Sequence, residues 1–553
     1  MSLKPQPIPD IPEDTARVVR AAFRKGNTWV SLRDQLGSIY RDEDFASLFS
    51  TRGQPAQAPW QLALVTIMQF AEGLSDEQAA SSVRGRIDWK YALSLELTDP
   101  GFDSSVLSEF RARLIEGQAE THMLEAILKL CRERKLIKER GKQRSDSTHV
   151  LAAIHVLNRL ENVGTTLRHA LNTLAVAAPE WLRAHAEPEW IERYGARVDE
   201  YRLPKGKAER IALGESIGAD GHKLLEAIYA ADAPEWLSRV PAVETLRRVW
   251  VQQYYLVGSR ARWRTAEDHG LAPAGVGIRS PHDPDARYSD KRSTTWVGYK
   301  AHLTETCDED KPRLITEVET TEASVPDHEV VDEIHQKLSA KQLLPAVHLM
   351  DAGYINADLI VRSKQQYGVE LCGPARPDTA WQAQAGKGFA ASDFSFDWEK
   401  RQVTCPSGKQ SISWQETTDR YGKAQVKTKF SVLDCRPCGH RNDCTKIDRR
   451  ILTIYRKEEF LALQQARERE KTKEYAKLYA KRAGIEGCLS QAVRSSGLRY
   501  ARYIGLTKIH LQNILTAAAT NVVRIINWVT DVPLAKTRRS PFIKLMRPEP
   551  LTC

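Results

Sequence analysis

The 553-residue chain is predicted to be an α/β protein, with a mixed sheet in its middle and helical segments before and after it. Two patterns support this prediction. Between residues 285 and 375, segments rich in β-branched and aromatic residues alternate with segments of helical spacing, which is typical of a sheet covered by helices. Elsewhere, apolar residues recur at helical spacing. With 42% hydrophobic residues and this length, the chain is expected to form several globular units.

Residues 1–20 are Pro-rich and polar and are predicted to be a flexible arm, followed by a helical N-terminal DNA-binding domain over residues 21–140. Ser75 and Asp76 are good caps for a helix that begins near Glu77. A helix, a turn and a basic helix are compatible with DNA binding, and equally with an ordinary helical bundle whose arginines are solvated. The candidate DNA contacts of this domain are Arg84, Arg86 and Lys90.

The α/β domain is predicted over residues 141–375 and 451–530, with a helical insertion at 160–280. TTWVGYKAHLTET and RLITEVETTEA are expected to be strands because they alternate and are rich in β-branched residues. SVPDHEVVDEIHQKLSA and ADLIVRSKQQYG are expected to be helices, and PAVHLMD a strand that ends in a carboxylate. HLQNILTAAATNVVRIINWV is apolar on a wide face and is expected to be a core helix.

A Cys-rich insertion is predicted over residues 376–450, where four cysteines follow the pattern C-x29-C-x2-C-x5-C. Turn residues beside each thiolate suit a tetrahedral structural zinc. An iron–sulfur cluster, His440 as an alternative ligand, and free thiols in a reducing compartment are the other interpretations. The candidate zinc ligands are Cys405, Cys435, Cys438 and Cys444.

The chain is basic, with a formal charge of +10 and an isoelectric point near 9.0. This balance favours a polyanionic partner, either nucleic acid or an anionic membrane surface, over a merely basic soluble enzyme. No apolar run reaches the length of a membrane span, and the first residues have no apolar core of a signal peptide. The chain is therefore expected to be cytoplasmic, without a membrane partner, and to end in a basic tail over residues 531–553.

Three acidic residues have contexts that suit metal-assisted phosphoryl chemistry, which needs acidic oxygens from separate chain segments. Asp146 lies where a polar segment passes into an apolar one, and Asp351 ends a predicted strand. Glu486 shares one helix face with Tyr479 and Arg482. Taken singly, a strand-end Asp is more often a solvated turn residue, and a Glu in a charged helix is more often a surface residue.

Five long stretches resemble a subgroup of bacterial insertion-sequence transposases of the DDE type, the subgroup with a Tyr-Arg-Glu-Lys signature and an InsH-like N-terminal domain. They include SDSTHVLAAI, HLMDAGYINADLIVRS and GIEGCLSQAVRSSGLRYARYIGL, and in the expected order they are spread over residues 42–524. The matching ranges are 42–80, 145–175, 294–321, 348–363 and 484–524.

The resemblance implies an RNase H-like core in which Asp146, Asp351 and Glu486 are the catalytic residues and hold two Mg²⁺ or Mn²⁺ ions. Tyr479 and Arg482 match the signature and are expected to support the site. The signature's Lys would fall at position 493, which is Val, and the neighbouring Arg494 is the candidate to supply the charge.

The function that the resemblance implies is a DNA transposase, which cleaves the DNA of an insertion sequence and transfers the strands. Its partners would be the terminal inverted repeats and target DNA, and it would act as a homodimer or a larger synaptic complex in the bacterial cytoplasm. The alternatives are a nuclease of the same fold that joins no strands, and a transposase-derived DNA-binding protein. Further candidate phosphate contacts, each also compatible with a solvated face, are Lys291, Arg292, Arg499, Arg502 and Lys508.

Overall fold

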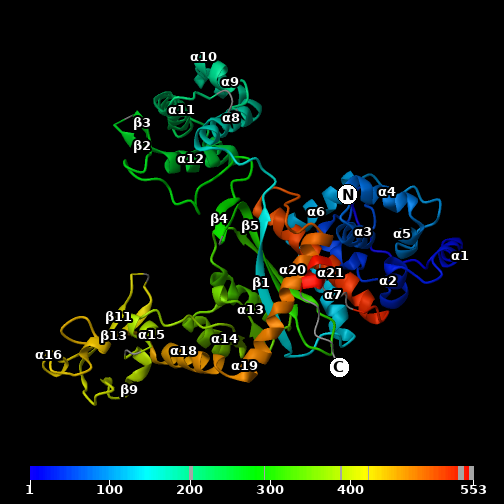
Figure 1. Ribbon diagram of the computed structural model, residues 1–553. Coiled ribbons are helices and arrows are strands. Elements are labelled where there is room, and N and C mark those ends of the chain that lie inside the picture. The colour runs from blue at the N-terminus through cyan, green and yellow to red at the C-terminus, as the bar shows by residue number, and fades with distance from the viewer. Residues whose placement is uncertain are drawn as a thin grey trace. The chain divides into compact units, whose positions relative to one another are not determined.

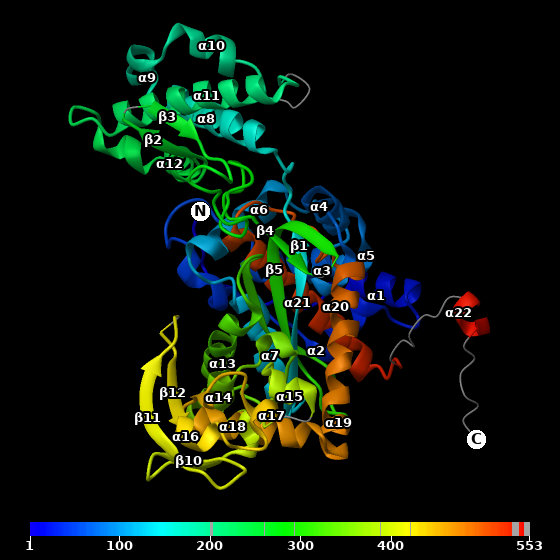
Figure 2. The same cartoon turned by 60° about the vertical axis from the view of Figure 1, so that its left-hand side comes forward.

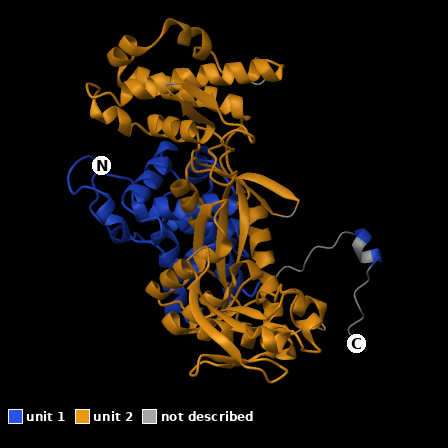
Figure 3. Ribbon diagram, turned by 90° about the vertical axis from the view of Figure 1, so that its left-hand side faces the viewer, with its two compact units in different colours: residues 1–136, 312–314, 515–553 blue, residues 137–311, 315–514 orange. Residues whose placement is uncertain are grey.

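The structure is a computed structural model that describes residues 1–198, 203–258, 260–291, 293–386, 389–420, 422–533 and 541–546. The chain divides into two compact units (Figure 3). Unit 1 comprises residues 1–136, 312–314 and 515–553, and unit 2 comprises residues 137–311 and 315–514.

The division differs from the predicted one at the C-terminal side. Helix α21 (Leu506–Val529) begins in unit 2 and ends in unit 1, whereas the whole of residues 451–530 was expected in the α/β domain. The long apolar face of α21 was predicted, and its buried residues include Ile514 and Val522. Of the predicted basic tail, residues 534–540 and 547–553 lie outside the described residues, and α22 (Pro541–Met546) lies between them.

Unit 1 is helical in its N-terminal part, as predicted. Helix α3 is buried from Pro59 to Phe70 and ends at Gly73, whose φ of 70° is the left-handed conformation that glycine tolerates best. Ser75 caps α4 and accepts a hydrogen bond from the backbone of Gln78, which confirms the predicted cap. The helices are α1 (Glu13–Ala22), α2 (Thr28–Leu36), η1 (Asp42–Leu48), α3 (Pro59–Glu72), α4 (Asp76–Gly85), α5 (Ile87–Ala92), α6 (Ser105–Glu116) and α7 (His122–Glu133).

The prediction of a flexible arm over residues 1–20 is wrong for its second half. Residues from Glu13 onward form α1, and Val19 on this helix is fully buried against Val30 and Tyr91. Ser2 also forms isolated bridges within unit 1 and is buried. The Pro-rich composition indicated an irregular segment, because the apolar face of this short helix has only a few residues.

Unit 2 contains a six-stranded mixed sheet. Five of its strands follow the order β4-β5-β1-β7-β8, and the sixth, β6, pairs with β5 (Figure 1). β1 pairs antiparallel with β5 and parallel with β7, so it lies inside the sheet. β5, β6, β7 and β8 lie where strands were predicted, the last of them from the segment VELCGPA. The strands are β1 (Lys142–Leu151), β4 (Arg287–Lys291), β5 (Thr294–Thr306), β6 (Ile315–Glu322), β7 (Val347–Leu349) and β8 (Glu370–Cys372).

Helices complete this part of unit 2. η4 (Asp327–Val330) and α13 (Val331–Ala340) confirm the first predicted helix, and α14 (Ala357–Tyr367), which ends at Gly368, confirms the second. After the Cys-rich segment the chain returns as a run of helices, and α20 packs against β1 in both views (Figures 1 and 2). These helices are α18 (Lys457–Glu470), α19 (Lys473–Tyr479), η7 (Ala480–Ala483) and α20 (Gly484–Ser495), with η5 (Ala352–Tyr354) between β7 and α14.

Residues 159–263, which lie in the predicted helical insertion, form a mainly helical segment with its own core, which includes Leu167, Leu246 and Trp250. The short hairpin of β2 and β3 inside it was not predicted. Its elements are α8 (Arg159–Ala177), α9 (Pro179–His185), α10 (Pro188–Tyr194), α11 (Lys207–Ile228), η3 (Glu235–Arg239), α12 (Pro241–Gln253), β2 (Tyr254–Val257) and β3 (Arg260–Trp263).

The Cys-rich insertion contains two small sheets around a core of Phe394, Val403 and Phe430. β13 pairs with β12, so the paired strands of this Cys-bearing segment continue to Tyr455, beyond residue 450. Its elements are α15 (Trp381–Ala385), η6 (Ala391–Asp393), β9 (Ser395–Asp397), β10 (Gln402–Thr404), β11 (Ser411–Thr418), β12 (Ala424–Phe430), α16 (Val432–Cys435), α17 (Arg441–Cys444) and β13 (Ile451–Tyr455).

A chain of polar side chains runs through the inside of the large sheet. The Ser145 hydroxyl lies 2.7 Å from His348 Nε2, and His348 Nδ1 lies 3.0 Å from His335 Nε2. Burial lowers the pKa of His335 to about 4 and that of His348 well below its usual range. Burial likewise lowers the pKa of His302 and of His510 to about 4. These imidazoles are therefore neutral near neutral pH.

A buried ion pair joins the start of α20 to the sheet. Arg144 on β1 lies 2.8 Å from the carboxylate of Glu305 on β5, and both side chains are buried. The same guanidinium donates a hydrogen bond of 2.5 Å to the carbonyl of Lys481. Gly484, the first residue of α20, lets this guanidinium approach, because a Cβ there would lie 2.0 Å from Arg144 Nη1.

We predict that Gly484→Ala destabilises the protein by about 2 kcal/mol, because Arg144 must move away and its hydrogen bonds to charged partners weaken. Urea unfolding measures this change. Gly487→Ala in the same helix is the matched control, since nothing lies within 4 Å of its added carbon. The control should gain about 0.5–1 kcal/mol from helix propensity. Equal changes in the two variants would show that Arg144 does not constrain this helix.

Candidate active site

Three acidic side chains from separate segments of unit 2 meet where the short strand β7 ends beside β1. Asp146 lies in the middle of β1, and Asp351 follows β7, the parallel neighbour of β1. Asp351 caps η5 and accepts a hydrogen bond of 2.9 Å from the backbone N–H of Gly353. Glu486 lies in the first turn of α20, where the helix dipole favours a negative charge. The convergence that the three contexts and the resemblance predict is thus present in the fold.

The guanidinium of Arg482 lies between these carboxylates. Its Nη2 is 2.5 Å from Asp146 Oδ2 and 3.7 Å from Asp351 Oδ2, and its Nη1 is 3.6 Å from Glu486 Oε1. Arg482 is 14% exposed, so its charge is only weakly screened by water. One cation of the chain therefore holds all three carboxylates together.

The three carboxylates differ in exposure. The Asp146 side chain is 11% exposed, that of Asp351 36% and that of Glu486 69%. Burial raises the pKa of Asp146, while Arg482 and Lys291 oppose that rise. The site is therefore closed at Asp146 and open to solvent at Glu486, which gives an ion or a DNA phosphate a way in.

The other two residues predicted to support the site, Tyr479 and Arg494, lie in different environments. Tyr479 stacks on Tyr475 at 5.5 Å between ring centroids and packs with Leu349 beneath the site, where burial raises its pKa. Arg494 is exposed, and the structure gives it no ion pair with the three carboxylates. It lies eight residues after Glu486, about 12 Å along the helix. Arg494 is therefore not brought to the carboxylates in this structure.

The basic residues predicted near the site differ in their exposure and in their contacts. Lys291, exposed at the end of β4, lies close enough for its charge to lower the pKa of both Asp146 and His149. Arg499 contacts the ring of His149, which also packs on Trp296. Arg502 is half-buried and Lys508 exposed, both beyond α20. Arg292 lies outside the described residues.

The basic residues predicted to contact DNA in unit 1 are engaged within the protein. Arg86 forms ion pairs with Glu72 and Asp88, and Arg84 is exposed and donates to a backbone carbonyl. The prediction that Lys90 contacts DNA is wrong, because its side chain is buried. Lys90 is 2% exposed, and its ammonium donates to the carbonyl of Asp99 at 2.7 Å. A buried ammonium satisfied by backbone carbonyls cannot reach a phosphate.

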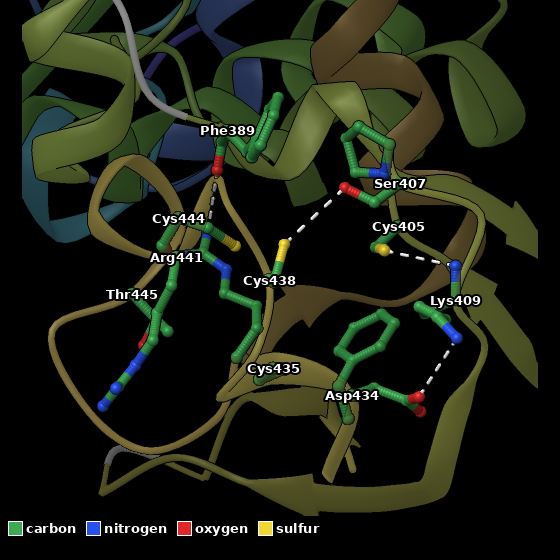
Figure 4. Close-up of a pocket in the computed structure, with 13 residues that line it drawn as sticks. Phe389, Cys405, Ser407, Lys409, Asp434, Cys435, Cys438, Arg441, Cys444 and Thr445 are labelled. Carbon is green, nitrogen blue, oxygen red and sulfur yellow. Dashed lines mark hydrogen bonds and ion pairs between the residues drawn. The ribbon is translucent and has the colours of Figure 1, made fainter. Parts of the chain in front are cut away.

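The four cysteines of the insertion line one small cavity (Figure 4). None of them forms a disulfide. Cys405 accepts a hydrogen bond of 3.3 Å from the backbone of Lys409. Burial raises the pKa of Cys444, and the thiols of Cys435, Cys405 and Cys438 raise it further. His440 is exposed and contacts Phe389.

Among the described residues, no group of three or more His, Cys, Asp or Glu side chains is arranged to hold a metal ion. This applies to the three carboxylates, which surround a guanidinium, and to the four thiols. The donor types at both places nonetheless suit metals: carboxylate oxygens suit Mg²⁺ and thiolates suit Zn²⁺.

The sequence interpretation missed a second polar group beside the carboxylates. Lys300 on β5 forms an ion pair of 3.0 Å with Asp327, and Ser147 on β1 donates to Asp327 at 3.3 Å. Asp327 follows Pro326 at the start of a helix and has the pattern of an ordinary cap. Only the sheet pairing, which brings β1 and β5 together, reveals its neighbours.

Two family models match the chain. The model described as a transposase DDE domain matches residues 404–526, and the one described as a transposase domain (DUF772) matches residues 18–113. No curated protein and no solved structure matches. The two matches support an insertion-sequence transposase of the DDE type, a role that implies DNA as the substrate and nuclease or transferase activity in general terms. Such enzymes generally use divalent metals such as Mg²⁺.

The first of these matches contains Glu486, Arg482 and Tyr479 but neither Asp146 nor Asp351. Those two aspartates are linked to the matched segment by the geometry around Arg482. In the part of the chain that the structure describes, no helix is both long and apolar enough to cross a membrane.

We predict that Arg482→Met lowers the free energy of unfolding at pH 7 by about 3 kcal/mol, because Asp146 would keep a buried charge without its partner. Without Arg482 the folded-state pKa of Asp146 rises further above its usual 3.8. The deficit is therefore largest at pH 7 and disappears as the pH falls below the folded pKa and Asp146 is protonated.

Urea unfolding at pH 7 and pH 4 measures this difference. Arg494→Met in the same segment is the control, and it should change stability by less than about 0.5 kcal/mol because Arg494 is exposed. A deficit of the same size at both pH values would contradict the assigned electrostatic role.

Proposed function

We propose that this chain is a DNA transposase that cleaves the ends of an insertion sequence and joins them to target DNA, with Asp146, Asp351 and Glu486 as its metal-holding carboxylates. The observation that carries the proposal is their convergence within 4 Å of the Arg482 guanidinium, from β1, the end of β7 and α20. Carboxylates that gather around a cation of the chain itself are suited to gather around external cations.

The arrangement of the sheet supports an RNase H-like core as the frame of this site. β4, β5 and β6 are antiparallel neighbours, whereas β1, β7 and β8 run parallel. The first aspartate lies on the inner strand β1, and the second follows the adjacent parallel strand. The glutamate arrives on a helix that packs against β1.

The proposed reaction has two steps with the same chemistry. Water forms a bond to the scissile phosphorus, the 3′-oxygen leaves and takes up a proton, and a 3′-hydroxyl results. That hydroxyl then attacks a target phosphorus, loses its proton and displaces the target's 3′-oxygen. Two Mg²⁺ or Mn²⁺ ions held by Asp146, Asp351 and Glu486 would supply Lewis acidity for these steps.

The chain's own residues hold and orient the reacting groups. Arg482 keeps the three carboxylates together, and its guanidinium is also suited to contact a phosphate oxygen. Lys291, whose charge acts on Asp146, and Arg499, which contacts His149 on β1, are the proposed phosphate contacts. Tyr479 packs under this segment and orients it, as the Tyr-Arg-Glu signature suggests.

Two other functions share this site. A nuclease of the same fold would hydrolyse the ends without joining them, and a transposase-derived binding protein would bind them without cleavage. The discriminating assay incubates the purified chain with Mg²⁺ or Mn²⁺, target DNA and the repeats that flank its gene. Joined product supports the proposal, hydrolysis alone supports the nuclease, and binding without cleavage supports the third function.

We predict that Asp351→Asn reduces cleavage by at least about 1,000-fold and leaves binding of the end DNA nearly unchanged, because one metal-holding charge is lost. Gel-based cleavage and mobility-shift assays measure the two effects. Asp358→Asn is the matched control: its side chain is 38% exposed, close to the 36% of Asp351, and it pairs with Arg362 within α14. Unchanged cleavage by Asp351→Asn would refute the assigned site.

We also propose that Cys405, Cys435, Cys438 and Cys444 hold a structural Zn²⁺. The support is their donor chemistry and their shared cavity (Figure 4). Thiolates that lie together repel each other, and a divalent cation offsets that repulsion. The site would fasten the loops that carry α16 and α17, since these short helices have few apolar residues of their own.

We predict close to one zinc per purified chain, and loss of it in Cys438→Ser, as measured by elemental analysis. The Cys438→Ser variant should also unfold at a lower temperature, because the metal contributes folding energy. His440→Ala is the control and should retain its zinc if the four thiols are the ligands. Iron in place of zinc, or a wild-type chain without metal, would contradict the proposal.

A further inference from the structure

The turn that presents Asp351 is held from behind by buried polar groups. After Asp351 the chain passes through Gly353 to Tyr354, which is fully buried and whose N–H donates to the carbonyl of Asp351 at 3.0 Å. The Tyr354 hydroxyl lies 2.7 Å from His302 Nδ1, and His302 Nε2 lies 3.1 Å from the hydroxyl of Thr321. One end of the turn is thereby fixed to β5 and β6.

Asp327 lies beside the same turn, because η4, which begins at Asp327, packs against η5. A Cβ added to Gly353 would come to 3.4 Å from Asp327 Oδ2, so the carboxylate faces the turn between Asp351 and Tyr354. Asp327 also accepts a hydrogen bond from Ser147, the residue after Asp146. Its carboxylate therefore bridges the two segments that carry the first and second aspartates.

Lys300 fixes Asp327 in turn. Its ammonium lies 3.0 Å from Asp327 Oδ1 and donates to the carbonyl of Val325 at 2.7 Å. The side chains of Lys300 and Asp327 are 14% and 13% exposed. A pair that is this buried, with its remaining hydrogen bonds satisfied, has a defined geometry, in contrast to an exposed ion pair.

We infer that Asp327 and Lys300 are positioning residues for the proposed metal site, and that they set the direction of the Asp351 carboxylate relative to Asp146. This inference rests on the proposed function. Neither residue needs to touch a metal or DNA: Asp327 acts through Gly353 and Ser147, and Lys300 acts through Asp327. Groups that orient metal-holding side chains typically change metal affinity or activity by about 10–100-fold when removed.

The test is the double variant Asp327→Asn/Lys300→Met, which removes one negative and one positive charge and so leaves the net charge near the site unchanged. Mn²⁺ bound to the full-length chain with its end DNA is measured by electron paramagnetic resonance, and cleavage is measured over the same Mn²⁺ range. We expect half-saturation to need at least about tenfold more Mn²⁺ in both measurements. Binding of end DNA without metal should not change.

The matched control is Glu317→Gln/Lys341→Met. This pair lies on the same sheet, with a distance of 2.7 Å and side chains 4% and 13% exposed, but on β6 and the end of α13. It should lower the free energy of unfolding and leave the Mn²⁺ curve in place. A Mn²⁺ curve of Asp327→Asn/Lys300→Met that coincides with the wild-type curve would overturn the inference, whatever its stability.

Two further outcomes are decisive. If Asp327→Asn alone abolishes Mn²⁺ binding as fully as Asp351→Asn, then Asp327 is itself a ligand, and the positioning role is wrong. If the wild-type chain shows no cleavage that depends on Asp351, the proposed function fails instead. Should the double variant not fold, Asp327→Glu is measured in the same way, and it must raise the Mn²⁺ requirement by a smaller factor for the inference to stand.

Discussion

The buried ion pair of Arg144 and Glu305 is the constraint on which the geometry of unit 2 depends. A charge at this depth is tolerated only with a partner, and Arg144 finds one on β5 while it also donates to the carbonyl of Lys481. The chain entering α20 is thereby tied to β1. Arg482 follows Lys481 directly, and Glu486 lies two residues after the glycine that touches Arg144. The Arg144 contacts that position the start of α20 therefore also position Arg482 and Glu486.

Local patterns predicted most elements of unit 2, because each has a signal within its own sequence. β5 and β6 alternate with a period of two, α14 ends at a glycine, and α4 begins at a capping serine. Asp146 and Asp351 were predicted from strand contexts together with a family resemblance. Their meeting around Arg482 was not predictable from either segment, since it depends on the parallel pairing of β1 with β7.

The predictions that failed concern groups whose surroundings come from distant parts of the chain. Lys90 looked like a surface cation in a basic stretch, but carbonyls from the following loop enclose its ammonium. The Pro-rich start concealed α1 because its burial is supplied by Val30 and Tyr91. Asp327 and Lys300 are 27 residues apart and meet only across a strand connection. Burial of charge is a tertiary property that composition does not report.

Three buried, neutral histidines on β5, α13 and α21 make unit 2 less stable in acid. His302, His335 and His510 have pKa values of about 4 when folded and near 6.5 when unfolded. The contribution of these histidines to the free energy of unfolding is complete above pH 6.5. It is lost as the pH falls toward 4, by about 1.4 kcal/mol per histidine for each pH unit. Acidification would thus destabilise unit 2 from its interior, where these imidazoles are buried.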